Sequence, residues 1–573
     1  MNNFSNKQRI AILTGLFVVI FGIIFFITKA GSDNSGNSEE KAAKRLANIL
    51  DDIKIKEASP IKATITDEDI LEEQEELPDI TKYPLTITGD KELNIEIFVS
   101  PEKAGSGTDG WMNEVAKKFN KSNPTVNGKE ASVSIRSVSS GLAVDYITSG
   151  KYVPDAITPS NDLWGKMIEA KNIQVEMVAE RLVGNQAGIL LSKKTYDKMV
   201  SEYGAVNMKS ITEATANNEI KMGYTNPFTS STGMNFLIST LYCYDSSDLL
   251  SDKAIAGFVK FQENVPLVSF NTLQMRKSAE SGSLSAFVLE YQTYINDAAL
   301  KSEYVFTPFG LRHDNPMYAV GELSEDKMAL LKMFTEYCLN AESQKLATDY
   351  GFNANDNYKS EMPNDFSGAT LISAQKLYKT NKNTSKTIMA VFVADVSGSM
   401  NGPAINNLRT SLLNSMQYIN SDNYIGLISY STDVTINLPV AKFDINQQSL
   451  FKGAVQSLDT TGNTATYDAV AVAINMLDEA KAEAVKEAEA NGEAAPDIKP
   501  LIFLLSDGQQ NSGCSLKDIR GIVEAYGYPI YSIGYNENIA ALEELSSINE
   551  AATIKSQSDD IIYQLKNLFN SEM

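Results

Sequence analysis

The sequence predicts an α/β protein with two folded α/β parts, preceded by one apolar segment long enough to cross a membrane. Strands begin to alternate with helices near Glu92, where LNIEIFVSP leads into a glycine-rich turn and the helix pattern WMNEVAKKFNK. The alternation begins again near Thr387, where KTIMAVFVADVSGSM is apolar enough for a central buried strand. A chain of 573 residues is too long for one ordinary core. We therefore expect two domains, each built on a parallel sheet with helices on both faces.

The N-terminus carries the expected membrane segment. Residues 10–28 contain no charged side chain and, as a helix, would be roughly 28 Å long, close to the thickness of the hydrocarbon core. Lys7 and Arg9 precede them, so residues 1–9 are expected in the cytoplasm and the remainder outside it. A cleaved signal peptide is the alternative, but the apolar run is long for one and the cleavage site is poor. We expect a single-pass anchor in the cell membrane.

Residues 29–90 are expected to form an acidic stalk. The stretch GSDNSGNSEE is flexible and polar, and one helix is predicted after it. Seven acidic residues then lie between Asp67 and Glu76, which is typical of a solvated spacer whose charges repel one another.

Composition excludes several classes of function. The formal net charge of −22 argues against nucleic acid as a partner, because binding to phosphates requires clustered Lys and Arg. His313 is the only histidine, so multi-histidine metal sites are excluded. Cys243, Cys338 and Cys514 show no metal-ligand spacing. A Cys243–Cys338 disulfide stays open at this point, although free thiols are favoured.

Residues 91–365 form the first expected domain, with small polar residues where its strands end. Ligands bind at the carboxyl ends of strands in such sheets. The stretch KMGYTNPFTSSTGMNFLIST predicts a strand, a polar turn and a helix whose start would favour a polar or anionic ligand. The alternative is a helix cap and nothing more. The candidate contacts at these strand ends and turns are Ser106, Ser139, Ser140, Ser160, Thr229, Ser230, Ser231 and Thr232.

This domain resembles bacterial extracellular solute-binding proteins with the type 2 periplasmic-binding-protein fold. The stretches that carry the resemblance are LVGNQAGILLSKKTYDKM, TNPFTSSTGMNFL, SLSAFVLEYQTYI and MYAVGELSEDKMALLKMFTEYCLNAESQKLATDYGF. The resemblance implies two lobes that close over a cleft, with the TSSTG helix start facing a small solute and with Glu290 and Tyr291 near the hinge.

Residues 366–386 are expected to link this domain to a second one at residues 387–573. In the second domain two central strands end in acid-plus-hydroxyl loops, DVSGSM and LLSDGQQ, and a third loop, TTGNTATYDA, opens a helix. Strand ends on one edge of a doubly wound sheet converge, so Asp395, Ser397, Ser399, Thr464 and Asp507 are expected to meet. Their ligand atoms are all oxygen, which suits Mg²⁺, Mn²⁺ or Ca²⁺ rather than zinc.

The five residues are similar to the metal-ion-dependent adhesion site of von Willebrand factor type A (VWA) domains. Asp395, Ser397 and Ser399 match its DxSxS motif, Thr464 matches its threonine loop and Asp507 its distal aspartate. The resemblance implies a Rossmann-like fold and an open metal position that a carboxylate of a partner protein completes. The alternatives are turn and cap residues without metal, or a metal site that recruits no partner.

Together these observations predict a membrane-anchored extracytoplasmic bacterial binding protein. Its outer domain would engage an extracellular or envelope protein through the cation, and its middle domain would capture or sense a small polar or anionic solute. The alternative is the receptor component of an ABC-type uptake system. An enzyme is not expected, because the metal set has no His or Glu base beside it.

Overall fold

The computed structural model describes residues 36–65, 77–269, 275, 279, 284–383, 386–507, 510–535, 539–549, 551, 553–555 and 561–573. The expected membrane anchor, residues 10–28, lies outside them. Within the described part of the chain, no helix is long and apolar enough to cross a membrane. The acidic run at residues 67–76 also lies outside it.

The C-terminal domain is built on one seven-stranded sheet, with the order β1-β16-β15-β14-β17-β18-β19. Without β1 this is the doubly wound order 3-2-1-4-5-6, in which β16 alone runs antiparallel to its neighbour β15. The strands are β1 (Ile55–Glu57), β14 (Thr387–Asp395), β15 (Tyr424–Tyr430), β16 (Val434–Lys442), β17 (Ile498–Ser506), β18 (Ile530–Gly534) and β19 (Thr553–Lys555). The apolar residues of β14 and β17 are buried from both faces, which is why these two stretches are almost continuously apolar.

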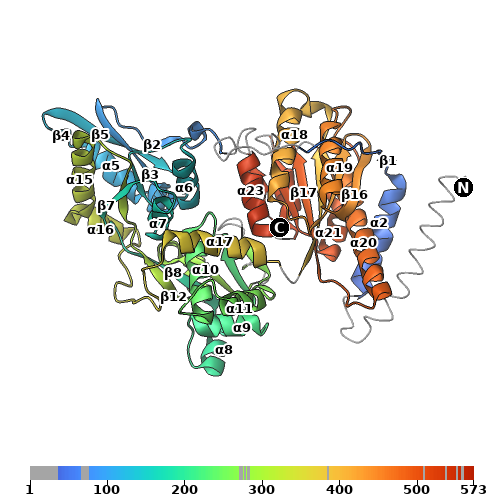
Figure 1. Ribbon diagram of the computed structural model, residues 1–573, viewed down its shortest axis with the longest axis horizontal. Coiled ribbons are helices and arrows are strands. Elements are labelled where there is room, and N and C mark those ends of the chain that lie inside the picture. The colour runs from blue at the N-terminus through green and yellow to red at the C-terminus, as the bar shows by residue number, and fades with distance from the viewer. Residues whose placement is uncertain are drawn as a thin grey trace, which may run out of the picture.

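Helices cover both faces of this sheet (Figure 1). One face packs against α18 (Pro403–Ser415), α19 (Ile445–Gln456) and α23 (Ile561–Glu572), through residues such as Leu408, Phe451 and Phe569. The other face packs against α20 (Thr466–Asn491), α21 (Leu516–Tyr526) and α22 (Ala540–Ser547). Short 3₁₀ turns lie at η4 (Gly398–Met400) and η5 (Met416–Tyr418). The expected doubly wound architecture is therefore present.

Residues 36–65 belong to this domain rather than to a stalk, and we call them the strap. Helix α2 (Gly36–Asp52) packs on α20 and α21, with Leu46 buried in the same core. Strand β1 pairs in parallel with β16, and Ala63 N donates to Ser449 O of α19 over 3.0 Å. The expectation of a spacer at residues 29–90 does not hold for the strap, because its backbone groups and apolar side chains find partners on this domain.

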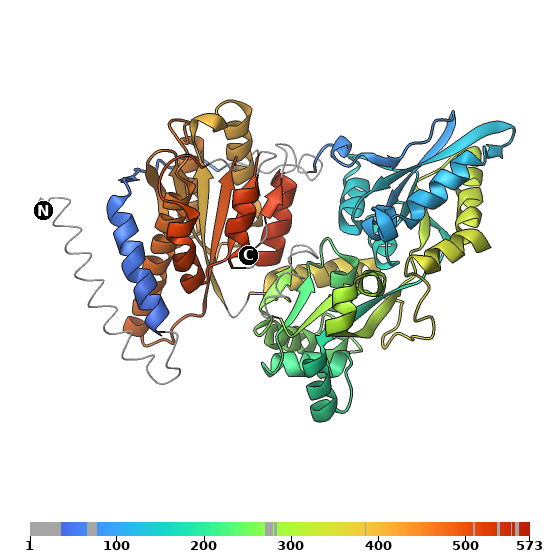
Figure 2. The same ribbon diagram turned by 180° about the vertical axis from the view of Figure 1, so that it is seen from behind.

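The middle domain lies between the strap and β14 in sequence and consists of two lobes (Figure 2). Lobe one has the strand order β2-β5-β3-β6-β13-β7, with β4 paired to β5. Its strands are β2 (Leu85–Ile87), β3 (Leu93–Val99), β4 (Thr125–Val126), β5 (Lys129–Ser137), β6 (Ala156–Thr158), β7 (Val175–Ala179) and β13 (Met317–Val320). Its helices are η2 (Ile80–Lys82), α4 (Pro101–Ala104), η3 (Gly107–Asp109), α5 (Trp111–Lys121), α6 (Ser140–Ser149), α7 (Leu163–Glu169), α15 (Glu325–Leu339) and α16 (Ala341–Asp349).

Lobe two has the strand order β10-β9-β11-β8-β12. Its strands are β8 (Asn185–Ser192), β9 (Met222–Thr225), β10 (Leu267–Ser269), β11 (Ala286–Glu290) and β12 (Tyr304–His313). Its helices are α8 (Lys193–Tyr203), α9 (Met208–Ala216), α10 (Ser231–Tyr244), α11 (Asp252–Gln262), α13 (Tyr291–Asn296) and α14 (Ala298–Glu303). The chain crosses between the lobes before β8 and again after β12.

Both middle sheets are mixed. Strands β5, β3 and β6, from which the sequence predicts a parallel sheet, do pair in parallel, but the prediction does not hold for the whole of either sheet. Strands β8 and β12 pair antiparallel, as do β7 and β13. The physical reason is the double crossing, since the chain that leaves lobe one along β7 returns to it along β13 in the opposite direction.

The expected linker at residues 366–386 contains a packed helix, α17 (Gly368–Asn381). Gly368 lies so close to the carbonyl oxygen of Lys166 in α7 that a Cβ atom there would come within 1.9 Å of it. Further along, Tyr378 is buried among aromatic rings of lobe two, including Tyr224 and Phe258. Helix α17 therefore packs on both lobes before the chain enters β14.

Candidate functional site

The first loop of the candidate metal site follows β14 directly. Asp395 is the last residue of the strand, and its Oδ1 atom accepts a hydrogen bond of 2.8 Å from the backbone N–H of Ser397. This bond turns the chain sharply, so that the hydroxyl oxygens of Ser397 and Ser399 lie 3.0 Å apart. Asp395 and Ser397 are buried, whereas Ser399 is exposed. The loop therefore presents its hydroxyl groups at the edge of the sheet.

The second loop, which carries Thr464, lies against the first. Thr461 N donates to Val396 O over 2.8 Å, and Gly398 N donates to Gly462 O over 3.1 Å. Gly462 has a φ of +69°, a conformation that glycine adopts readily. Thr464 is buried just before α20, and its backbone N–H donates to the side chain of Asn511 over 2.8 Å. The structure thus brings the threonine loop beside the DxSxS loop, as expected.

Asp507 follows β17, the strand next to β14, and it is also buried. Burial raises the pKa of the Asp395 carboxyl, and the nearby charge of Asp507 raises it further, against hydrogen bonds from Ser397 and Ser506 that lower it. Asp507 thus lies near enough to Asp395 for its charge to act on that carboxyl. A pair of buried carboxylates in this arrangement favours a bound cation, which would remove their repulsion.

Three residues that the sequence did not single out orient Asp395. The hydroxyl groups of Ser506 and Tyr430 donate to its Oδ2 atom, over 2.8 and 3.2 Å. Thr466 in turn donates to the Tyr430 hydroxyl over 3.3 Å. Ser506 and Tyr430 are the last residues of β17 and β15, and both strands flank β14. Their position at the carboxyl ends of the neighbouring strands is the signal that could have identified them.

The donor set fits a hard divalent cation. The Ser397 and Ser399 hydroxyls are hydrogen-bonded to each other over 3.0 Å, a separation that adjacent oxygen ligands of Mg²⁺ also have, since ligands at 2.0–2.1 Å in octahedral geometry lie about 3.0 Å apart. Across the residues described, no three His, Cys, Asp or Glu side chains form a metal cluster. A cation here would therefore depend on the hydroxyl groups of Ser397, Ser399 and Thr464 as well as on the two carboxylates.

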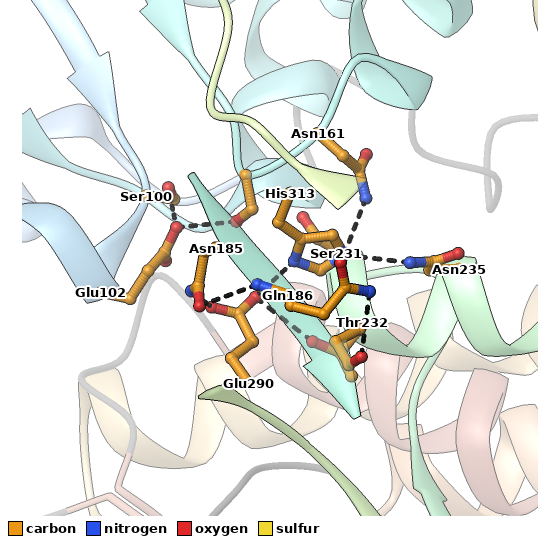
Figure 3. A network of polar contacts seen from close by, with 12 residues as sticks. Ser100, Glu102, Asn161, Asn185, Gln186, Ser231, Thr232, Asn235, Glu290 and His313 are labelled. Atoms are coloured by element: carbon orange, nitrogen blue, oxygen red, sulfur yellow. Dashed lines mark hydrogen bonds and ion pairs between the residues drawn. The ribbon is translucent and has the colours of Figure 1, made fainter. Parts of the chain in front are cut away.

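A dense polar network joins the two lobes of the middle domain (Figure 3). At its centre Glu290 Oε1 lies 2.8 Å from His313 Nδ1, and Glu290 Oε2 accepts a bond of 2.7 Å from Asn185. The hydroxyl of Thr232 donates to the same carboxylate over 3.3 Å. Glu290 thus joins the start of α10 to the strands that connect the lobes.

The ring of His313 is fixed in orientation by its neighbours. Asn235 donates its Nδ2 to Leu311 O over 2.7 Å and accepts from Leu311 N over 2.9 Å, which fixes the orientation of its amide. The same Nδ2 lies 3.2 Å from His313 Nε2, so Nε2 is the acceptor and the ring proton is on Nδ1, facing Glu290. His313 is therefore part of the polar network between the lobes, a role that its polar sequence context did not indicate.

Lobe one contributes a second partly buried carboxylate, Glu102, beside the fully buried Lys103. The Lys103 ammonium donates to Glu102 over 3.2 Å, to Asn315 over 2.7 Å and to the hydroxyl of Ser100. Burial opposes the charge of Glu102, but Lys103 and the hydroxyls of Ser100 and Ser160 outweigh it and lower the pKa of this carboxyl. Burial lowers the pKa of Lys103 despite the pairing. The sequence analysis did not single out Glu102 and Lys103, although they lie just after β3, which ends at Val99.

The predicted cleft residues divide into three groups. Five of them, Ser140, Ser160, Ser231, Thr232 and Glu290, join this network or the contact between lobes: Ser160 donates to Glu102 over 2.8 Å, Thr232 to Glu290 over 3.3 Å, and Ser231 to Ser140 over 3.2 Å. Ser139 and Ser230 precede α6 and α10 as N-caps. The others are Ser106, which is exposed, Thr229, which is half-buried, and Tyr291, whose ring packs on Phe306.

A cavity of about 530 Å³ lies elsewhere, lined by residues that include Asp162, Leu311, Arg312, Tyr358 and Met362. None of the ten predicted cleft residues lines it. The free state of all three cysteines agrees with the favoured reading of the sequence and excludes the Cys243–Cys338 disulfide.

Comparison with known protein families identifies the C-terminal domain. Residues 390–570 match the model of the von Willebrand factor type A domain. The chain carries a VWA domain. Curated relatives of this part include inter-alpha-trypsin inhibitor heavy chain H3 from Bos taurus, 30% identical over 157 residues, and heavy chain H4 from Homo sapiens, 27% identical over 191 residues. These matches cover 26% and 31% of this chain but only 16% and 19% of those proteins.

Solved structures similar to parts of the chain include three that match at low identity. A von Willebrand factor type A protein from Catenulispora acidiphila is 16% identical, with a TM-score of 0.27 over 32% of this chain and 42% of that chain. Iron-bound HitA from Pseudomonas aeruginosa is 12% identical, with a TM-score of 0.36 over 50% and 99%. The periplasmic binding protein AfuA from Actinobacillus pleuropneumoniae is 12% identical, with a TM-score of 0.37 over 51% and 98%.

Proposed function

We propose that the protein is a membrane-anchored extracytoplasmic binding protein whose VWA domain recruits a protein or other carboxylate-bearing partner through a divalent cation. The observation that carries this proposal is the 3.0 Å separation of the Ser397 and Ser399 hydroxyls beside two buried carboxylates. Asp395, Ser397, Ser399, Thr464 and Asp507 would hold Mg²⁺, or Mn²⁺ or Ca²⁺ in its place. A bound cation would supply an open position for a carboxylate of the partner.

The residues of this chain have distinct roles in that site. Tyr430 and Ser506 hold one oxygen of Asp395, so that the carboxylate cannot rotate away from the loop. Asn511 holds the backbone of Thr464. The exposed hydroxyl of Ser399 marks the side from which a partner would approach.

The test is a pull-down with the full chain from envelope extract, with Mg²⁺, with EDTA, and with the variant Asp395→Ala. We expect one partner to be retained with Mg²⁺ and lost in both other samples. Retention in all three samples would contradict the proposal. The chain should not be shortened at residue 90, because the strap at residues 36–65 would then be removed from the VWA domain.

The proposed role of the middle domain is to capture or sense a small polar solute. The carboxylate of Glu290 has no Lys or Arg partner among the described contacts and would repel an anion, whereas Glu102 is paired with Lys103, so of the two ligand classes expected from the sequence a neutral polar one fits better. Thermal shift with neutral sugars, beside sulfate and phosphate, tests this choice. Stabilisation by sulfate or phosphate alone would contradict it. A growth defect restricted to one solute after deletion would favour the uptake receptor instead.

A further inference from the structure

Helix α23 belongs to the core of the VWA domain by one of its faces. The Phe569 ring lies 5.7 Å from the ring of Phe392 in β14 and 5.1 Å from that of Phe503 in β17. These rings are fully buried. The position of α23 on the sheet is therefore set by close aromatic packing.

A second face of α23 contacts both lobes of the middle domain. The hydroxyl of Tyr563 donates to Asp145 in α6 of lobe one over 3.1 Å. Asn226, in the loop between β9 and α10 of lobe two, donates to the carbonyl oxygen of Asn567 over 3.2 Å. Tyr563 and Asn567 are four residues apart, so they lie on the same side of the helix. Tyr563 is 3% exposed and packs in the middle-domain core.

The two points that α23 contacts flank the place where the lobes meet. There Trp164 of lobe one donates from its Nε1 to the Ser231 hydroxyl of lobe two over 2.8 Å. Gly141 in α6 approaches the carbonyl oxygen of Phe228 so closely that a Cβ atom would come within 2.2 Å of it. Phe228 lies in the loop that begins with Asn226, and its N–H donates to the Asn226 side chain over 2.9 Å.

We propose that α23 is a latch that holds the two lobes together, so that the lobes separate only when this helix of the VWA domain releases one of them. The latch is a property of the contacts alone and does not depend on metal or solute binding. Access to the space between the lobes of the middle domain then depends on the docking of the VWA domain.

The chain contains its own probe of lobe separation, because it has only two tryptophans. Trp164 lies at the contact between the lobes, whereas Trp111 is buried within lobe one and donates to Ser343 O. In a Trp111→Phe background of the full chain, the emission maximum and the acrylamide quenching of Trp164 report its exposure.

The test combines Tyr563→Phe, which removes the donor to Asp145, with Asn226→Asp, which removes the donor to Asn567 O but keeps the acceptor for Phe228 N–H. Each lost hydrogen bond changes an equilibrium by about fivefold, so the double variant should raise the ratio of open to closed lobes by about thirtyfold. We expect a red shift of Trp164 emission and stronger quenching. The matched control is Tyr203→Phe, which removes a bond of 2.8 Å to Glu219 within lobe two and should change neither quantity.

Unchanged Trp164 emission and quenching in a folded double variant would overturn the proposal, since the lobes would then be held by their own contacts and by α17. A change of the same size in Tyr203→Phe would overturn it as well. If the Trp111→Phe protein folds poorly, hydrogen exchange in proteins that retain Trp111 tests the same proposal. The peptides to follow are those that contain Ser140 and Ser231. Faster exchange in the double variant alone supports the latch.

Discussion

Lys54 and Asp433 form an ion pair of 2.7 Å although 379 residues separate them in the sequence. Lys56 pairs with the same carboxylate over 2.7 Å, and these contacts lower the pKa of Asp433. Asp433 follows Thr432, whose hydroxyl accepts from the N–H of Asn463, next to Thr464. The middle of the strap therefore lies beside one loop of the candidate metal site.

Gly453→Ala should destabilise the VWA domain by displacing the strap. A Cβ atom at Gly453 in α19 would lie 1.7 Å from the carbonyl oxygen of Ile61, which cannot move without the rest of the strap. In a helix free of such contacts the same change would stabilise by about 1 kcal/mol. Thermal unfolding should therefore show a lower Tm, with faster hydrogen exchange at residues 58–65.

Gly521→Ala in α21 is the matched control for this substitution. Its Cβ atom would meet only the end of the flexible Arg45 side chain, at 3.2 Å. We expect an equal or higher Tm. A Tm that falls equally in both variants would show that the strap contact is not the cause.

Ser506→Ala should weaken cation binding without unfolding the domain. The hydroxyl of Ser506 holds one oxygen of Asp395, and removing such a supporting bond lowers metal affinity by about 10- to 100-fold in known sites. Mn²⁺ titration followed by electron paramagnetic resonance measures the change. Ser532→Ala in β18 of the same sheet, which removes the acceptor of a 2.8 Å bond from Ser546 in α22, should leave the affinity unchanged. Equal affinities in all three proteins would contradict this role.

Lys103→Met should cost about 3 kcal/mol of stability, because it leaves the partly buried Glu102 carboxylate without its cation. Adding Glu102→Gln should restore part of that loss. Urea unfolding of the two variants measures both effects. In contrast, Lys117→Met breaks an exposed pair with Glu114 and should change stability by less than about 1 kcal/mol. A loss as small for Lys103→Met would mean that Glu102 is neutral.

The stability of the docked α23 should rise with pH above neutrality. Burial lowers the pKa of Lys379 to about 7, while its ammonium donates to Phe569 O at the end of α23 over 3.0 Å. Between about pH 7 and the ordinary value of 10.5, the unfolded chain binds more protons than the folded one, so stability increases with pH in this window.

Urea unfolding at pH 7 and at pH 9.5 tests this sign. The increase should be smaller in Lys379→Met, and it should persist in Lys376→Met, whose side chain is exposed on the same helix. An equal pH dependence in all three proteins would show that Lys379 does not cause it.

The VWA fold and the placement of its site loops follow from local sequence patterns. The apolar runs that end at Asp395 and Ser506 are the two central strands, and their order in the chain is enough to bring Asp507 beside Asp395. The supporting contacts of Tyr430 and Thr466 depend on which strands are neighbours, so no motif carries them.

The strap could not be predicted in the same way. Strand β1 is three residues long and its residues are exposed, so Ile55–Glu57 shows no alternation of apolar and polar residues. Its pairing with β16 depends on a partner far along the chain. The polar network around His313 could not be predicted for a similar reason, since Glu290, Asn185 and Asn235 come from two different strands and a helix.

The long separation between β1 and β16 sets an order of events during synthesis. Chains grow at about 5–20 residues per second, so roughly 20–80 s pass between the appearance of Lys54 and that of Asp433, 379 residues later. In that interval the middle domain has time to form, whereas β1 of the strap cannot yet pair with β16. The backbone groups of the β1 segment therefore stay unpaired for tens of seconds during synthesis. Unpaired strand edges favour aggregation and chaperone binding, so this is the interval in which both are expected.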